Sequence, residues 1–242
     1  MQQEAIVQTL VLIKPDALKN SLTGYILSQL SEYHTGLRYA GTKIVTVNKM
    51  IAEEHYAEHK GKIFFPSLIE YISGCLHYPN EPWKRRVIAF VFHGSDAIKK
   101  IRTICGPTNP HLAREQQPGC IRAMGTIVPL KDADGKVIGE RMDNLIHASA
   151  NPEDAEREIK LWFKPSDIPP SMRTFAISIS EKQYFYKDGR LFFTPESGNI
   201  CLVSPGDVVW KSDLDALELL SKGQKANLSI ESIAAKYFIN HI

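Results

Sequence analysis

The sequence lacks several features that would assign it to a class at once. Its longest uninterrupted apolar run, residues 87–92 (VIAFVF), is six residues, whereas a helix that crosses a membrane needs about 20. We therefore expect no membrane partner. The four cysteines form no Cys-x-x-Cys pair and no metal-knuckle spacing, which favours free thiols and a cytoplasmic location. Residues 1–5 carry no basic segment, so we expect no signal peptide.

The charge is nearly balanced, with 29 Lys and Arg against 27 Asp and Glu and a net charge of +2. This balance argues against a nucleic-acid-binding surface. Two phosphate-binding signatures are also missing from the sequence, Gly-x-x-x-x-Gly-Lys-Ser/Thr and Gly-x-Gly-x-x-Gly. Their absence excludes a P-loop and removes the usual cues for a Rossmann fold or a protein kinase.

The chain has 242 residues, 43% of them hydrophobic, which suffices for a substantial core. Residues 9–13 and 87–92 have the composition of buried strands, and residues 96–104 have helical spacing. Residues 105–119 are rich in Gly and Pro and predict a long loop. Connections between the expected elements are too short for a doubly wound parallel sheet. We therefore expect an α+β sandwich with a mostly antiparallel sheet.

The spacing of the expected strands and helices changes after Pro165. Pro169 and Pro170 indicate a linker, and the Asp188-Gly189 pair predicts the turn of a hairpin. Two short helical patterns follow. The expected organisation is a first domain over residues 1–165 and a small α+β C-terminal extension over residues 166–242, whose role the sequence does not indicate.

Polar residues at the ends of the expected elements point to phosphate and sugar chemistry. Arg supplies bidentate donors to phosphate oxygens, Lys supplies a point charge, and Asn can both donate to and accept from ribose hydroxyls. Residues of these types, with one hydroxyl and one imidazole, are Lys14, Arg102, Thr108, Arg122, Asn144 and His147.

Their order along the chain resembles the nucleoside diphosphate kinase family. Five separated segments carry the resemblance: residues 11–17 (VLIKPDA), 60–68 (KGKIFFPSL), 106–122 with GPTNP and PGCIR at its ends, 144–149 (NLIHAS) and 158–163 (EIKLWF). The resemblance covers roughly residues 7 to 165.

The resemblance implies a ferredoxin-like α+β sandwich with an antiparallel sheet. It also implies transfer of the terminal phosphate of a nucleoside triphosphate to a nucleoside diphosphate, which maintains the NTP and dNTP pools. The mechanism would be ping-pong, through a phosphohistidine at His147. Mg²⁺ would arrive with the nucleotide, with no metal bound directly by the protein. The family also implies a homo-oligomer built from dimers, a tetramer or a hexamer.

The resemblance assigns a role to each matching residue. Lys14, Arg102, Thr108 and Arg122 would hold the phosphates, with Tyr56 nearby; Phe64 would stack on the base, with Leu68 on its pocket wall; Asn144 and Lys14 would contact the ribose; Glu158 would orient His147, and Ser149 would support it. Phosphoryl transfer needs mainly positioning and charge neutralisation, which such a set supplies.

Two further features are open to alternatives. His55 and His59 are four residues apart, as in some metal pairs, but the His-Glu-x-x-His order and a third ligand are missing. We interpret them as a solvated helix face or as a support for the site. Insertions near residues 75–86 and 123–143 distinguish the chain from short family members, and we expect the second to form a hairpin. The alternative function is a catalytically weak nucleotide-binding or regulatory subunit with the same fold.

Overall fold

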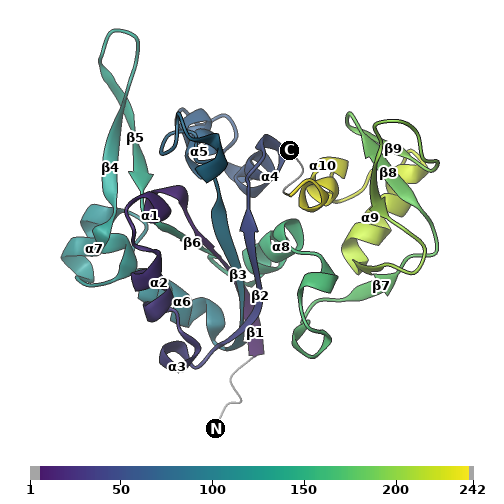
Figure 1. Cartoon of the computed structure of the whole chain (residues 1–242), viewed down its shortest axis with the longest axis horizontal. Coiled ribbons are helices and arrows are strands. Elements are labelled where there is room, and N and C mark those ends of the chain that lie inside the picture. Colours follow the sequence, from purple (N-terminus) through teal and green to yellow (C-terminus); the bar gives the residue numbers. More distant parts are fainter. Residues whose placement is uncertain (1–5, 240–242) are drawn as a thin grey trace.

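A four-stranded antiparallel sheet forms the centre of the molecule. The computed structural model describes residues 6–239 and is shown in Figure 1. The strands β1 (Ile6–Ile13), β2 (Arg38–Val45), β3 (Val87–Ser95) and β6 (Ile146–Ala148) are arranged in the order β2-β3-β1-β6, with every neighbouring pair antiparallel. The expected α+β sandwich is confirmed.

Alternation along β1 divides the core into two layers. Leu10 and Leu12 face one cluster, whereas Val11 and Ile13 face the other, because successive side chains of a strand point to opposite faces. The first layer packs under the helices α4 (Lys49–His55), α5 (Phe65–Ile72) and α8 (Pro152–Trp162). The second packs under α1 (Pro15–Lys19), α2 (Thr23–Gln29) and α6 (Ala97–Cys105), and the short helix α3 (Glu32–Thr35) follows α2.

The prediction of a loop over residues 105–119 is wrong in the middle of this segment, where the structure has the helix α7 (Pro110–Gln116). The Asn109 side chain accepts hydrogen bonds from the backbone N–H groups of His111 and Leu112. Pro110 occupies the first turn, where it costs no backbone hydrogen bond. An Asn cap followed by Pro is a helix-start signal that the Gly and Pro content concealed.

The expected hairpin in the second insertion is confirmed. Strands β4 (Thr126–Lys131) and β5 (Val137–Asp143) pair antiparallel and project away from the sheet, at the upper left of Figure 1. Its C-terminal strand ends immediately before Asn144. Short 3₁₀ turns complete this half of the chain: η1 (Ala57–His59), η2 (Pro82–Lys84) and η3 (Ile121–Met124).

The C-terminal extension has an α+β fold of its own. Its elements are β7 (Ile177–Ile179) paired with β11 (Val208–Trp210), the sheet β10-β8-β9 made of β8 (Tyr184–Lys187), β9 (Arg190–Phe192) and β10 (Ile200–Val203), and then α9 (Lys211–Ser221), α10 (Ile230–Ala234) and η6 (Ala235–Tyr237). The turn at Asp188-Gly189 is the one expected. A buried ion pair joins α9 to η6, from Lys236 Nζ to Asp213 Oδ2 at 2.8 Å.

The prediction of a linker at Pro169-Pro170 is wrong, because this segment packs onto the hydrophobic core. Two 3₁₀ turns, η4 (Pro165–Asp167) and η5 (Pro170–Met172), bracket Ile168, which is 1% exposed, and the Met172 carbonyl accepts a hydrogen bond from Gln8 Nε2 at 2.7 Å. Further on, fully buried Trp210 donates from Nε1 to the Phe163 carbonyl at 2.7 Å. Residues after Pro165 therefore share a hydrophobic core with the central sheet.

Within residues 6–239, none of the helices has the length and apolar character needed to cross a membrane. The expectation about a signal peptide concerns residues 1–5, which lie outside the described residues.

Candidate functional site

A cleft of about 350 Å³ opens where β1, β6, α4, α5 and the loop before α7 meet. Ten of the residues singled out from the sequence line it: Lys14, Tyr56, Phe64, Leu68, Arg102, Thr108, Arg122, Asn144, His147 and Glu158. His55 lines it as well, and Ser149 lies directly behind Glu158. The structure therefore brings together residues that are more than 140 positions apart in the sequence.

A hydrogen bond at one of its two nitrogens holds the imidazole of His147. Its Nε2 lies 2.9 Å from Glu158 Oε2, and an ionised carboxylate can only accept, so Nε2 carries the proton. Nδ1 of the neutral ring is then an unprotonated nitrogen with a lone pair. The His147 side chain keeps 17% of its surface exposed and lines the cleft, so the ring is partly accessible within a largely enclosed site.

Glu158 is fixed by two further features. Asn151 caps α8 by accepting a hydrogen bond from the Asp154 backbone N–H at 2.8 Å, which sets where the helix begins. The Ser149 hydroxyl donates to Glu158 Oε2 at 2.6 Å and accepts from the Leu10 backbone N–H at 3.1 Å. Burial alone would raise the pKa of Glu158, but the nearby imidazole of His147 and these hydrogen bonds outweigh burial and lower it to about 2. The carboxylate is therefore ionised at neutral pH.

His55 is buried, so its interpretation as part of a solvated helix face is wrong. It lies on α4 at 2% exposure, because α4 packs against α8 and the indole Nε1 of Trp162 donates to His55 Nδ1 at 3.2 Å. Burial, followed by the proximity of His147, lowers the pKa of His55 well below its usual value. A neutral imidazole that accepts at Nδ1 carries its proton on Nε2. The ring centroids of His55 and His147 are 4.5 Å apart.

These residues also have the types found in metal sites. One ligand atom each from His55, His147 and Glu158 lies within 4.8 Å of the others. The Glu158 bond to His147 and the Trp162 bond to His55 already engage one nitrogen of each ring. The remaining nitrogen of each ring lies in the same cleft.

A chain of hydrogen bonds connects the cationic side of the cleft. Lys14 Nζ donates to Asn144 Oδ1 at 2.7 Å, and Asn144 Nδ2 donates to the Thr108 carbonyl at 2.9 Å. Burial lowers the pKa of Lys14 to about 8. Arg122 is 4% exposed and donates from Nη1 to the Gly106 carbonyl at 2.9 Å. The loop before α7 is thus tied to the end of β1 and to β6.

Three buried polar atoms on the lining residues of this cleft have no partner among the described residues: His55 Nε2, Tyr56 Oη and Arg122 Nε. Buried donors without acceptors are uncommon, since each costs about 1–3 kcal/mol. All three can donate a hydrogen bond. The cleft is therefore suited to a ligand rich in acceptor oxygens.

The opposite side of the cleft is aromatic and apolar. Phe64 immediately precedes α5, and its ring centroid is 5.6 Å from that of His59, which in turn stacks on Tyr56 at 6.1 Å. Leu68 follows on the first turns of α5 and also lines the cleft. This wall can pack against a flat aromatic group.

Sequence reasoning missed a contribution from the hairpin. Glu140, Arg141 and Met142 of β5 also line the cleft. The available signal was position: this strand runs directly into Asn144, so its last residues had to lie near the site.

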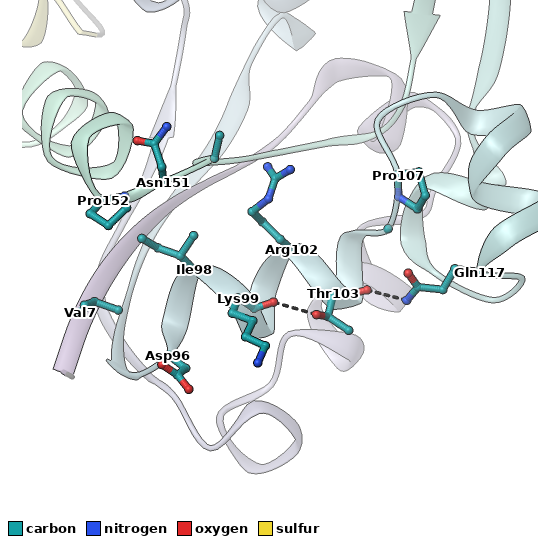
Figure 2. Close-up of a pocket in the computed structure, with 12 residues that line it drawn as sticks. Val7, Asp96, Ile98, Lys99, Arg102, Thr103, Pro107, Gln117, Asn151 and Pro152 are labelled. Carbon is teal, nitrogen blue, oxygen red and sulfur yellow. Dashed lines mark hydrogen bonds between the residues drawn. The ribbon is translucent and has the colours of Figure 1, made fainter. Parts of the chain in front are cut away.

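A larger and more open hollow, about 660 Å³, lies on another side of Arg102. Figure 2 shows Arg102 projecting from α6, with Asn151 and Pro107 on either side, while Gln117 donates to the Thr103 carbonyl at 2.6 Å. Among the described residues, those that line this hollow include no imidazole. We therefore assign the chemistry to the smaller cleft, which contains His147.

The chain is similar to known proteins of one family. The family model of nucleoside diphosphate kinases matches residues 7–168. The nucleoside diphosphate kinase of Thermococcus kodakarensis is 38% identical over 168 residues, 69% of this chain and 83% of that protein. That of Pyrococcus furiosus is 39% identical over 163 residues, 67% of this chain and 86% of that protein.

Two solved structures are similar as well. The nucleoside diphosphate kinase of Aquifex aeolicus superimposes with a TM-score of 0.54 at 32% identity, covering 68% of this chain and all of that one. The enzyme of Borrelia burgdorferi, a transition-state mimic with bound vanadate and ADP, gives a TM-score of 0.52 at 31% identity and covers 70% of this chain and 94% of that one.

Proposed function

The chain belongs to the nucleoside diphosphate kinase family, and we propose that it transfers the terminal phosphate of a nucleoside triphosphate to a nucleoside diphosphate through a phosphohistidine at His147. The observation that carries the proposal is the pairing of His147 with Glu158 at 2.9 Å inside a cleft lined by cations. This pairing leaves one imidazole nitrogen free to attack phosphorus.

In the first half of the reaction, His147 Nδ1 attacks the terminal phosphorus, and the bond from phosphorus to the bridging oxygen of the diphosphate breaks. The imidazole gains positive charge as the bond forms, and the Glu158 carboxylate at Nε2 stabilises that charge. The diphosphate leaves, and a second nucleoside diphosphate then takes the phosphoryl group from Nδ1 by the reverse steps. The free enzyme returns with its original protonation.

The buried donors hold the phosphate oxygens. Lys14, Arg102 and Arg122 supply positive charge, and Thr108 lines the same wall. The unpartnered Tyr56 Oη and His55 Nε2 gain acceptors when the substrate binds. In this proposal His55 acts as a supporting donor beside the nucleophile. The substrate is the magnesium complex of the nucleotide, since the cations of the cleft suit phosphate oxygens rather than a bare Mg²⁺.

The nucleoside occupies the other side of the cleft. Phe64 stacks on the base with Leu68 beside it, and Asn144 with Lys14 binds the ribose hydroxyls. Stacking accepts any base, because every base has a π face. The proposed role is therefore the maintenance of NTP and dNTP pools, in the cytoplasm, where the four free cysteines would remain reduced.

We also propose how the chain is organised. Residues 1–165 form the kinase domain, which assembles into a homo-oligomer, and residues 166–242 brace it. Ser232 Oγ on α10 donates to Glu54 Oε2 at 2.7 Å, and Asn48 Nδ2 donates to the Phe238 carbonyl at 3.4 Å. Both bonds reach α4, the helix that carries His55, so the extension supports the wall of the cleft.

The test is incubation of the purified chain with ATP labelled at its terminal phosphate. We expect an acid-labile, alkali-stable phosphoprotein that loses its label to any added nucleoside diphosphate, and we expect His147→Ala to form none. His93→Ala is a matched control, because His93 lies on β3 and is not among the residues that line the cleft. A wild-type chain that binds nucleotides but forms no phosphoprotein would favour the alternative, a catalytically weak regulatory subunit.

A further inference from the structure

The hairpin strand β5 passes close to the segment that carries Phe64. A Cβ atom built on Gly139 would lie 3.5 Å from Ile63 Cγ2, at van der Waals contact. Two residues further along β5, Arg141 lines the same 350 Å³ cleft as Phe64. Residues two apart on a strand point to the same side. Arg141 and Phe64 therefore come from two segments that border one slot.

The Arg141 guanidinium is held in a fixed plane. Its Nε donates to Asp143 Oδ1 at 2.6 Å and its Nη2 to Asp143 Oδ2 at 3.1 Å, and such a fork leaves little rotational freedom. Asp143 is itself held by His77 Nε2 at 2.9 Å, and the His77 carbonyl accepts from Lys19 Nζ at 2.6 Å. The Arg141 side chain is 14% exposed. Residues of both inserted segments thus fix one flat cation at the cleft.

Resting on the proposed function, we infer that Arg141 forms the second wall of the base slot and stacks on the face of the base opposite Phe64. One face of the Arg141 guanidinium lies over the Tyr71 ring, with Cζ 5.9 Å from the ring centroid. Because the pairing with Asp143 is edge-on, the opposite face is left for a base, and Arg stacks on aromatic faces by cation–π attraction. Its charge is already compensated by Asp143, which makes it a weaker phosphate ligand than Arg102 or Arg122. Purines offer the larger π face, so Arg141 adds a preference for purine nucleotides.

The experiment separates stacking from charge by using three probes on the full chain. Binding of GDP, CDP and inorganic tripolyphosphate is measured by calorimetry for the wild type, Arg141→Gln and Arg141→Lys. The control is Lys131→Gln, which removes one positive charge from an exposed position on the same hairpin. Arg141→Lys retains the charge beside Asp143, so it keeps the test informative if Arg141→Gln does not fold.

Loss of one stacking partner is expected to raise the Kd for GDP about tenfold in both Arg141 variants, and to raise that for CDP about threefold. Binding of tripolyphosphate, which has no base, should change less than twofold, and Lys131→Gln should match the wild type. Equal weakening of all three probes would make Arg141 a phosphate ligand and overturn the inference, as would unchanged GDP binding. A wild type that phosphorylates His147 while the variants bind GDP normally would sink this inference alone, whereas a wild type without phosphohistidine would sink the proposed function.

Discussion

Replacing Glu158 by Gln removes the charge that supports His147 while keeping a similar shape. The pKa of Glu158 falls from an ordinary 4.5 to about 2, which corresponds to about 3 kcal/mol of net stabilisation of the carboxylate by its surroundings. The His147 ring is the largest favourable contributor to that shift. If the transition state loses this amount, phosphorylation slows about a hundredfold. Because Glu158 touches the ring rather than the nucleotide, KM should stay within about twofold.

The assay is rapid-quench phosphorylation of the enzyme by ATP, which isolates the first half-reaction. Glu156→Gln serves as the control, because Glu156 is an exposed carboxylate on the same helix. A rate for Glu158→Gln within threefold of the wild type would refute the reasoning, and so would a loss found only in KM. The depressed pKa also predicts a pH effect: the stability advantage of the wild type over Glu158→Gln is present above pH 4.5 and disappears as the pH falls towards 2.

Three other predictions follow from burial and charge. Trp210→Ala should lower the free energy of unfolding by about 3–5 kcal/mol in denaturant titrations, while exposed Trp83→Ala changes it little; equal effects would contradict a shared core. Lys236→Met should cost about 3–5 kcal/mol by leaving Asp213 buried and unpaired, and a second change, Asp213→Leu, should restore much of it. Because Lys14 has a pKa of about 8, kcat/KM should fall as the pH rises through 8, and Lys14→Arg should abolish this alkaline decrease. A wild-type pH profile of kcat/KM that is flat to pH 9 would count against the role of Lys14.

Much of the site could be predicted because its residues follow local rules. Lys14 and Asn144 stand at strand ends, and the Asn151 cap with Pro152 fixes where α8 begins and hence where Glu158 points. A resemblance spread over separated segments then supplied the roles of these residues. The two central strands, β1 and β3, are recognisable in the sequence as short apolar runs, because most of their residues are buried on both faces.

The errors at His55 and at Pro169-Pro170 have a common cause, which is tertiary contact. His55 reads as a polar residue on a helix, yet Trp162, more than 100 positions away, supplies its hydrogen bond and buries it. Pro169 and Pro170 read as a linker, yet apolar Ile168 and Met172 turn that segment onto the core. The position of Arg141 just before Asn144 indicates that it lies near the site, but the approach of the hairpin to Ile63 is a tertiary contact that the sequence does not show.

The regiochemistry of the phosphohistidine tests the account most directly. Phosphorus NMR of the denatured phosphoenzyme at alkaline pH distinguishes phosphate on Nδ1 from phosphate on Nε2. Since Glu158 occupies Nε2 of His147, we predict a single phosphohistidine at His147 that carries the group on Nδ1. Phosphate on Nε2, or on any other residue, would contradict the arrangement on which the proposed reaction depends.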